Sequence, residues 1–470
     1  MVDSIIPRAA PRGGIIRGTP LDSRSCGRPM SCEEPAKVRF PGGRGNLDVY
    51  QVMRLPNLHL LFAILLSVSC GGRTRLDSLA ATDGRIVSSG GTTATGGVVS
   101  TGGSESSGGT GGTGGGLGTC TWGFDPQVRY SVGSIPGEVV AGDLDNDGFL
   151  DLAVTTLNNV SVFINRKDGT FLPPRTYDGG NWPVSLTPGD FNADGFLDLV
   201  AVTNVNGTSA VSMLFNRGDG SFQPPVTFPA GKTPDESMVG DLDNDGSLDL
   251  AVANSDSFSI FLNRGDGTFL PQVMYEVPGM SIAALADFDR NGSLDLAATN
   301  NGLGTVGILF NQGDGTFQSP ITYAADVGAS SVAAADYNGD GAPDLAIAHS
   351  DQWNANNGGD TVTVLLNQGN GTFRSGVSYA VGSYAGTLRS GDFNSDGSPD
   401  LVVPNEHDDT MSVLLNRKDG TFQPQIPYAT GRLPETIAVG DFNRDGALDL
   451  AVTNRQDNAI GVFFGRCRLR

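Results

Sequence analysis

Short apolar runs alternate with polar, glycine-rich turns over residues 120–470. Each unit of this pattern contains an Asp-rich loop, an apolar run of the type Leu-Ala-Val, a variable loop and a second apolar run such as 413–415. A turn and a third run, which ends near an aromatic residue such as Tyr428, complete the unit. No stretch keeps an apolar period of about 3.6 residues, which argues against a helical solenoid. The pattern predicts four short strands in each unit.

These units are internal repeats of one motif. Its first Asp moves from Asp143 to Asp441 in six steps, a mean period just under 50 residues. Four strands in such a repeat are typical of a propeller blade, and rings of about 4–8 blades are usual. A right-handed β-helix is the alternative fold, but its repeat is normally shorter. We therefore expect an all-β, seven-bladed β-propeller with four-stranded blades. The motif occupies residues 142–152, 189–199, 240–250, 286–296, 335–345, 391–401 and 440–450.

The two ends of the array complement each other. Too few residues follow the last motif for a complete blade, whereas 124–130 matches 422–428, the outer strand of a blade. We expect the N-terminal strand to join the C-terminal blade and so remove an exposed edge. On this alignment Cys120 and Cys467 both fall at the position of Lys418, which predicts a disulfide that locks the ring after export. Two unpaired thiols that align by coincidence are the alternative.

Net charge and composition narrow the function classes. The formal charge of −21 argues against nucleic acid as a partner, because phosphate binding requires clustered Lys and Arg. Three His leave little material for zinc sites or His-based catalysis, and five Cys are too few for a disulfide-rich scaffold. Since residues 1–119 carry a balance of +4, the acidity belongs to 120–470.

The first 119 residues resemble targeting and linker segments. Residues 1–52 show no periodicity, and we interpret them as an unstructured upstream extension of a protein that starts at Met53. A basic start, a short apolar core and small residues predict a signal peptide over 53–70. A buried strand of a small N-terminal domain is the alternative. The Gly/Ser/Thr-rich segment 71–119 is predicted to be a flexible tether for a globular head.

The residues that end the signal segment suggest a lipid anchor. The stretch 66–70 resembles a bacterial lipoprotein signal, in which the Cys becomes the lipidated first residue of the mature chain. Cys70 is therefore the expected lipidation site, although Ser67 stands where that family has Leu. Plain secretion is the alternative.

Each Asp loop has the form D-x-[DN]-x-[DN]-G-x-x-D, which is rich in oxygen donors. Calcium takes six to eight oxygen ligands, and closely spaced carboxylates on a tight turn can provide them. In the first loop we expect ligands from Asp143, Asp145, Asp147 and Asp151 and from the carbonyl of Phe149. The equivalent residues of the other loops are Asp190, Asn192, Asp194 and Asp198; Asp241, Asp243, Asp245 and Asp249; Asp287, Asp289, Asn291 and Asp295; Asp336, Asn338, Asp340 and Asp344; Asp392, Asn394, Asp396 and Asp400; and Asp441, Asn443, Asp445 and Asp449.

Asp and Gly also make good turns, which is the alternative explanation of these loops. A turn needs one or two such residues, whereas four oxygen donors recur here seven times. We therefore expect up to seven calcium ions, with the tightest binding in loops one and three, which carry four carboxylates each. Their role is expected to be structural, since the loops contain no nucleophile.

These motifs give the chain a clear resemblance. Residues 124–466 resemble the FG-GAP/VCBS repeat proteins, which include the seven-bladed head of integrin α-subunits and bacterial exported proteins. The resemblance implies calcium between the first and second strands of each blade and ligand binding on the opposite face. It does not imply a particular ligand, since a fold does not fix a function.

Candidate ligand-binding residues lie in the loops expected on that opposite face. They are Trp182, Trp353, Asn354, Tyr384 and His407. Exposed aromatic rings beside amides and carboxylates suit stacking on a sugar or a protein hot spot. Ordinary loop decoration is the alternative for each of them. The run 406–409 could serve as an acid/base pair or a metal site, but no nucleophile motif accompanies it.

We therefore expect no catalytic residues and no enzyme activity, but a cell-surface binding or adhesion module with a monomeric head. Its ligand would be an extracellular glycan or protein, and it would touch a membrane only through its lipid anchor. The expected localisation is export, as an outer-membrane or cell-surface lipoprotein or as a secreted protein. A propeller lyase or hydrolase acting on polysaccharide and a purely structural surface spacer are the alternatives.

Overall fold

The computed structural model describes residues 120–205, 208–277, 279–350 and 360–469. The compact unit that contains them spans Cys70–Arg470. The segments 1–52, 53–70 and 71–119, with the predicted lipidation site Cys70, lie outside the described residues, as do Trp353 and Asn354.

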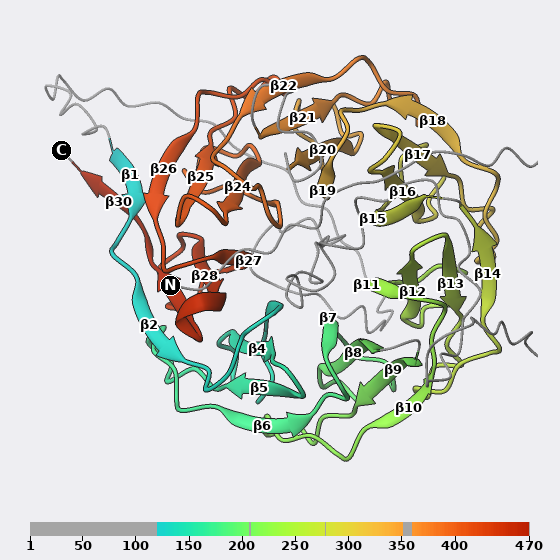
Figure 1. Ribbon diagram of the computed structural model, residues 1–470, viewed down its shortest axis with the longest axis horizontal. Helices are drawn as coiled ribbons and strands as arrows, with labels where there is room; N and C mark the ends of the chain where they lie inside the picture. The colour runs from blue at the N-terminus through green and yellow to red at the C-terminus, as the bar shows by residue number, and fades with distance from the viewer. Residues whose placement is uncertain (1–119, 206–207, 278, 351–359, 470) are drawn as a thin grey trace, which may run out of the picture. The chain divides into compact units, whose positions relative to one another are not determined.

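The described residues form seven four-stranded antiparallel sheets, and Figure 1 shows them arranged as the blades of a ring. The predicted all-β propeller with seven four-stranded blades is confirmed. Blades 1–3 are β3 (Val139–Gly142), β4 (Asp151–Thr155), β5 (Asn159–Phe163) and β6 (Arg175–Asp178); β7 (Pro183–Gly189), β8 (Asp198–Val205), β9 (Thr208–Leu214) and β10 (Val226–Pro229); and β11 (Pro234–Gly240), β12 (Asp249–Asn254), β13 (Ser257–Phe261) and β14 (Val273–Glu276).

The remaining blades repeat this order from an inner to an outer strand. Blades 4–6 are β15 (Met280–Ala286), β16 (Asp295–Asn300), β17 (Thr305–Leu309) and β18 (Ile321–Ala324); β19 (Ala329–Ala335), β20 (Asp344–His349), β21 (Thr361–Leu365) and β22 (Val377–Ala380); and β23 (Arg389–Gly391), β24 (Asp400–Asn405), β25 (Thr410–Leu414) and β26 (Ile426–Ala429). Blade 7 contains β27 (Pro434–Gly440), β28 (Asp449–Asn454), the short 3₁₀ helix η2 (Arg455–Asp457), β29 (Ala459–Phe463) and, as its outer strand, β2 (Val128–Ser131).

The two chain ends close the ring. Strand β2 pairs with β29, with Tyr130 opposite Ile460, as the match of 124–130 to 422–428 predicts. A further two-stranded sheet pairs β1 (Cys120–Phe124) with β30 (Gly465–Leu469). This second sheet, which the sequence did not indicate, lies beside the outer strands of blades 6 and 7 in Figure 1.

The register of β1 with β30 bears on the expected disulfide. Cys120 lies opposite Leu469, and Cys467 lies opposite Trp122, so the cysteines are on neighbouring strands but two positions apart. The alignment placed both cysteines at the position of Lys418. In the antiparallel hairpin of blade 6, however, Lys418 lies opposite Gly420 and not opposite a second copy of its own position. Such diagonal neighbours are about 7–8 Å apart between Cα atoms, beyond the usual disulfide range. The Cys120–Cys467 bridge stays a prediction, which peptide mapping without reductant would test.

The hydrophobic core lies between neighbouring blades. The two middle strands of a blade are buried almost throughout; in β12, for example, all six residues are buried. Val160 of blade 1 packs in one cluster with Leu186 and Leu199 of blade 2. Full burial of such a side chain contributes about 1.5–3 kcal/mol each, so the blades depend on one another for stability.

Aromatic pairs join each blade to the next near the rim. In each pair an aromatic residue of one outer strand contacts the Phe that ends a neighbouring turn, with ring centroids 5.2–5.5 Å apart. These signature residues therefore connect blades as well as shaping turns. The pairs are Tyr130–Phe171, Tyr177–Phe222, Phe228–Phe269, Tyr275–Phe317, Tyr323–Phe373, Tyr379–Phe422 and Tyr428–Phe124.

Candidate metal sites and the opposite face

The Asp loops connect the first and second strands of every blade. Because the strands are antiparallel, all seven loops lie at one end of the blades, together with the turns that connect the third and fourth strands. We call this end the metal face. The loops between second and third strands and the crossovers between blades lie at the other end, which we call the crossover face.

The first Asp of each loop organises the backbone. Asp143 accepts hydrogen bonds from the N–H groups of Asp147 (2.9 Å) and Gly148 (2.8 Å). The turn that these bonds close has two left-handed residues, with φ of 57° at Asn146 and 92° at Gly148. Glycine is needed at the second position because L side chains rarely adopt that conformation. The same pair of bonds recurs at Asp190, Asp241, Asp287, Asp336, Asp392 and Asp441.

The last Asp of each loop is buried and holds two segments together. One carboxylate oxygen of Asp151 accepts the N–H of Leu144 (2.9 Å) and the other accepts the N–H of Asn165 (2.7 Å). Burial raises the pKa of this carboxyl to about 7. Asp198, Asp344, Asp400 and Asp449 show the same burial-driven rise in pKa to about 7, and Asp249 and Asp295 show one to about 6.

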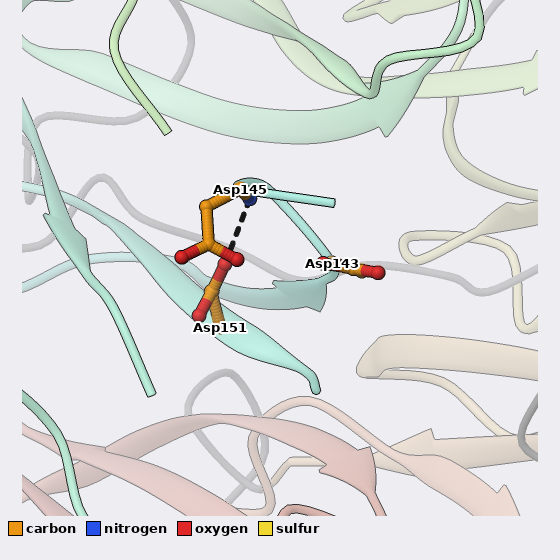
Figure 2. A group of neighbouring side chains, drawn as sticks. All are labelled: Asp143, Asp145 and Asp151. Carbon is orange, nitrogen blue, oxygen red and sulfur yellow. Dashed lines mark hydrogen bonds between the residues drawn. The ribbon is translucent and has the colours of Figure 1, made fainter. Parts of the chain in front are cut away.

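Three loops bring carboxylates together in a geometry that could hold a cation. In blade 1, Asp143, Asp145 and Asp151 each offer one oxygen, and these oxygens lie within 4.8 Å of one another. Figure 2 shows Asp145 directly above Asp151, with the bond from the Asp145 N–H to the Asp151 carboxylate. The other two clusters are Asp241, Asp243 and Asp249 in blade 3 and Asp287, Asp289 and Asp295 in blade 4.

These are the three loops that have Asp at position three. The other four loops have Asn there, which offers an amide oxygen to a cation. Asn192, Asn338 and Asn443 donate through Nδ2 to the Asp two residues later, at 2.9–3.0 Å. In blade 6, by contrast, Asn394 Oδ1 is buried without a hydrogen-bond partner among the described residues. A buried amide oxygen without a donor suits a cation ligand.

The fifth and seventh positions of the loop also hold the turn. Asp147 accepts the N–H of Phe149 at 2.9 Å, and equivalent bonds are made by Asp194, Asp245, Asn291, Asp340, Asp396 and Asp445. The donor set fits calcium, because it consists of carboxylate and amide oxygens and contains no nitrogen or sulfur ligand.

Electrostatic repulsion within the loops also favours a bound cation. Burial raises the pKa of Asp145, and the neighbouring charges of Asp147 and Asp143 raise it further. The pKa of Asp243 is raised for the same reasons. A divalent cation would offset this cost.

Basic side chains partly offset the charge in some loops. Lys167 Nζ lies 3.2 Å from the Asp147 carboxylate, and Lys418 Nζ lies 3.7 Å from Asp396. Arg290 reaches from blade 4 to Asp340 of blade 5, at 3.7 Å. No such ion pair is found for loop three in the described part of the chain, so loop three is the more acidic of the two four-carboxylate sites.

On the crossover face, the structure brings two of the predicted ligand residues together. Tyr384 and His407 stack, with ring centroids 4.3 Å apart. Trp182 lies apart from them, at the entry to blade 2. Its side chain is 37% exposed, and its φ of 51° is unusual for an aromatic residue.

Sequence reasoning missed a pocket on this face. Its lining combines Trp182 with Glu138, Glu435 and Arg455 from blades 1 and 7. One signal was present in the sequence: Glu138 directly precedes β3 and Glu435 lies in β27, and the equivalent residues of other blades are mostly uncharged, except in blade 3.

Comparisons with known proteins identify the family of the repeats. The FG-GAP-like repeat profile matches residues 143–201, 190–252, 241–298, 287–347 and 392–452. No curated protein matches the sequence significantly. No helix in the described ranges is long and apolar enough to cross a membrane.

Two solved structures are similar to the chain. A lectin from Agrocybe aegerita, described as recognising non-reducing terminal N-acetylglucosamine, has 19% identity and a TM-score of 0.46, covering 70% of this chain and 85% of the lectin. A protein from Bacteroides uniformis, proposed to be a 6-phosphogluconolactonase, has 14% identity and a TM-score of 0.47, covering 72% and 92%. The repeat matches cover more than half of the sequence, and each matched range includes strands of a propeller blade. The chain therefore belongs to the FG-GAP-like repeat family.

Proposed function

We propose that this protein is a calcium-stabilised binding module that recognises an extracellular glycan or protein with its crossover face. The observation that carries the proposal is that the loops at the two ends of the blades differ in composition. Oxygen donors recur in every loop of the metal face, whereas the crossover face varies from blade to blade and presents exposed aromatic and polar side chains.

The calcium part of the proposal rests on the clustered oxygens and on their unfavourable electrostatics without a cation. Asp143, Asp145 and Asp151 would hold the ion in blade 1, with the equivalent residues in the other blades. Bound calcium would supply positive charge that offsets carboxylate repulsion and fixes the loops. Since every loop already connects an inner strand to its neighbour, this role is structural.

The binding part rests on the side chains that the crossover face exposes. The Tyr384–His407 stack and Trp182 offer aromatic surface beside hydrogen-bonding groups. Aromatic residues are enriched at binding hot spots, and an aromatic beside polar groups suits a sugar ring or a peptide.

We propose no enzymatic role for the run 406–409. Asp408 accepts the N–H of Ser383 at 2.7 Å, and the His407 N–H donates to the Ser383 carbonyl at 3.2 Å. These contacts attach the loop to the crossover, which is a sufficient role for Asp408. A polysaccharide lyase or hydrolase remains the alternative, and release of products from polysaccharides would favour it.

Export as a lipoprotein or secreted protein completes the proposal. The signal-like segment 53–70 and Cys70 support it, and the tether 71–119 would hold a monomeric propeller away from a membrane. Labelling with a radioactive fatty acid, compared with Cys70→Ala, would test the anchor.

The decisive experiment is a glycan-array and pull-down screen of the purified protein, with calcium and with EDTA. The proposal expects specific capture that weakens in EDTA as the propeller loosens. If the calcium-loaded, folded protein captures no glycan and no protein, the binding role is wrong and the spacer alternative is favoured.

A further inference from the structure

A pocket opens on the crossover face where blades 7, 1 and 2 meet. It is open to solvent on one side, and the space in and in front of it amounts to about 460 Å³. Its walls come from the crossover before β3, the loop after β4, the start of β7, the start of β27 and η2. Residues from three blades are therefore required to build it.

Two buried carboxylates lie in this pocket, and an arginine accompanies each. Arg455 contacts both carboxylate oxygens of Glu435, at 3.3 Å each. Glu138, only 2% exposed, lies 3.8 Å from Arg389 and accepts the N–H of Leu186 at 2.5 Å. Each carboxylate thus has an arginine close to it, although Arg389 stands behind Glu138 and does not line the pocket. Paired buried carboxylates give an ionic ligand little to bind.

The polar groups are held rigidly. Thr155 Oγ1 accepts the Glu138 N–H at 2.7 Å, and Thr436 Oγ1 lies 3.1 Å from the Gly137 carbonyl, to which it donates. Arg455 still exposes 17% of its side chain. Because its guanidinium has five N–H donors, it can bind Glu435 and a ligand oxygen together.

Trp182 supplies the apolar wall. Its backbone N–H donates to the Leu157 carbonyl at 2.9 Å, which fixes the crossover to blade 1. The same crossover position is also left-handed at Thr233, Tyr384 and Leu433, so the fold imposes this conformation. What distinguishes Trp182 is its partly exposed indole ring, which faces the pocket as an apolar surface.

We propose that this pocket binds one neutral sugar residue, with a face of the ring stacked on Trp182 and hydroxyls bonded to the Arg455–Glu435 pair. The pocket is small and open on one side, which limits it to a single sugar ring, and the open side would lead the rest of a glycan out over the face. A purely apolar ligand would cover the exposed part of Arg455 and offer it no hydrogen bond in place of the water that it loses. The inference rests on the proposed function, for which it specifies the ligand class and the site.

The test is a titration of the full chain, with calcium present, against neutral monosaccharides: glucose, galactose, mannose, fucose, N-acetylglucosamine and N-acetylgalactosamine. Saturation-transfer NMR reports binding, and the indole N–H resonance of Trp182 reports its place. We expect at least one sugar to bind and to shift that resonance. Binding should weaken about tenfold or more in Trp182→Ala and in Arg455→Lys.

Thr233→Ala is the matched control, because it changes the equivalent left-handed crossover position of blade 3. It should leave sugar binding unchanged. If Trp182→Ala fails to fold, the Trp182 resonance of the native protein still decides, since a bound sugar that leaves it unshifted overturns the inference. Unchanged affinity in a folded Trp182→Ala also overturns it.

The two proposals fail separately. If no neutral sugar of the panel binds but the array or pull-down still captures a ligand, the pocket assignment is wrong and the binding role stands. If neither assay captures anything, both are wrong.

Discussion

The carboxylate of Asp151 accepts the backbone N–H of Asn165 at 2.7 Å, which joins the Asp loop of blade 1 to the next turn on the same face. Asn165 continues the connection, because its Nδ2 donates to the Leu150 carbonyl at 2.9 Å and to the Phe442 carbonyl of blade 7 at 2.8 Å. One Asp and one Asn thus link a loop, a turn and the neighbouring blade.

This link repeats around most of the ring. The turn Asn donates to the carbonyl of the second loop residue in the preceding blade, at 2.7–2.8 Å, for Asn216, Asn263, Asn311, Asn367 and Asn416 as well. Blade 7 has Gly465 in the place of the Asn. Its junction with blade 6 is held instead by β1 and by the aromatic pair of Tyr428 with Phe124.

Removal of this link should destabilise the propeller. Asn263 is buried, and its Nδ2 donates to the carbonyls of Phe191 and Leu248. Asn263→Ala leaves both carbonyls without that donor, so we expect a loss of about 1–3 kcal/mol in the free energy of unfolding. Urea unfolding at saturating calcium measures it. Asn370→Ala, in the exposed part of the same turn in blade 5, is the control and should change little. Equal effects in both variants would contradict a role for the interblade bond.

The repeat pattern predicted the blades well because each signature residue makes the same contact in blade after blade. The first Asp shapes the turn, the last Asp joins the loop to the next turn, and the Phe of that turn packs on the adjacent blade. Strand number, blade number and the closure by β2 all follow from that regularity.

The rest could not be read from periodicity. The pocket assembles Glu138, Trp182 and Arg455 from loops that differ between blades and are far apart in the sequence. The sequence also did not show that Cys120 and Cys467 lie two positions apart across β1 and β30, because alignment onto a single hairpin gives a residue its position but not its partner. The sequence also predicted equally tight calcium binding at the loops of Asp147 and Asp245, although only Asp147 has the ammonium group of Lys167 beside it.

Lysine 167 should weaken calcium binding in blade 1. It occupies a left-handed position, with φ of 70°, where blades 2 and 3 have Gly218 and Gly265. Lys167→Gly removes a positive charge beside Asp147 without straining the backbone, so calcium affinity should rise. The ammonium group is largely exposed, and we therefore expect only about a two- to fivefold gain.

A calcium titration followed by the Gly148 amide resonance measures that gain. Lys232→Ala, which removes a charge from the crossover face, is the control and should leave the affinity unchanged. Weaker binding in Lys167→Gly would contradict competition between the lysine and the cation.

The stabilisation by calcium should depend on pH. In the calcium-free folded protein, burial raises the pKa of Asp151, Asp198 and Asp449 to about 7. In the unfolded chain the same carboxyl groups have a pKa of about 4. Between these values the folded state binds more protons, so the calcium-free protein loses stability as pH rises from about 4 to about 7. Calcium binds the ionised carboxylates, so protons compete with it at low pH.

The gap in melting temperature between calcium and EDTA should therefore be larger at about pH 7.5 than at about pH 5. Calorimetry in both conditions measures it. An equal gap, or a larger one at the lower pH, would show that these buried carboxyls do not control calcium binding.

The central claim is that the seven loops bind calcium and that the ions hold the propeller together. Calorimetric melting of the native protein at about pH 7.5, in excess calcium and in EDTA, tests it most directly, with native mass spectrometry to count the ions. The account predicts several bound calcium ions and a melting temperature that falls by more than about 10 °C in EDTA, because each saturated site adds binding free energy to the folded state. A protein that carries no calcium and melts at the same temperature in both solutions would contradict it.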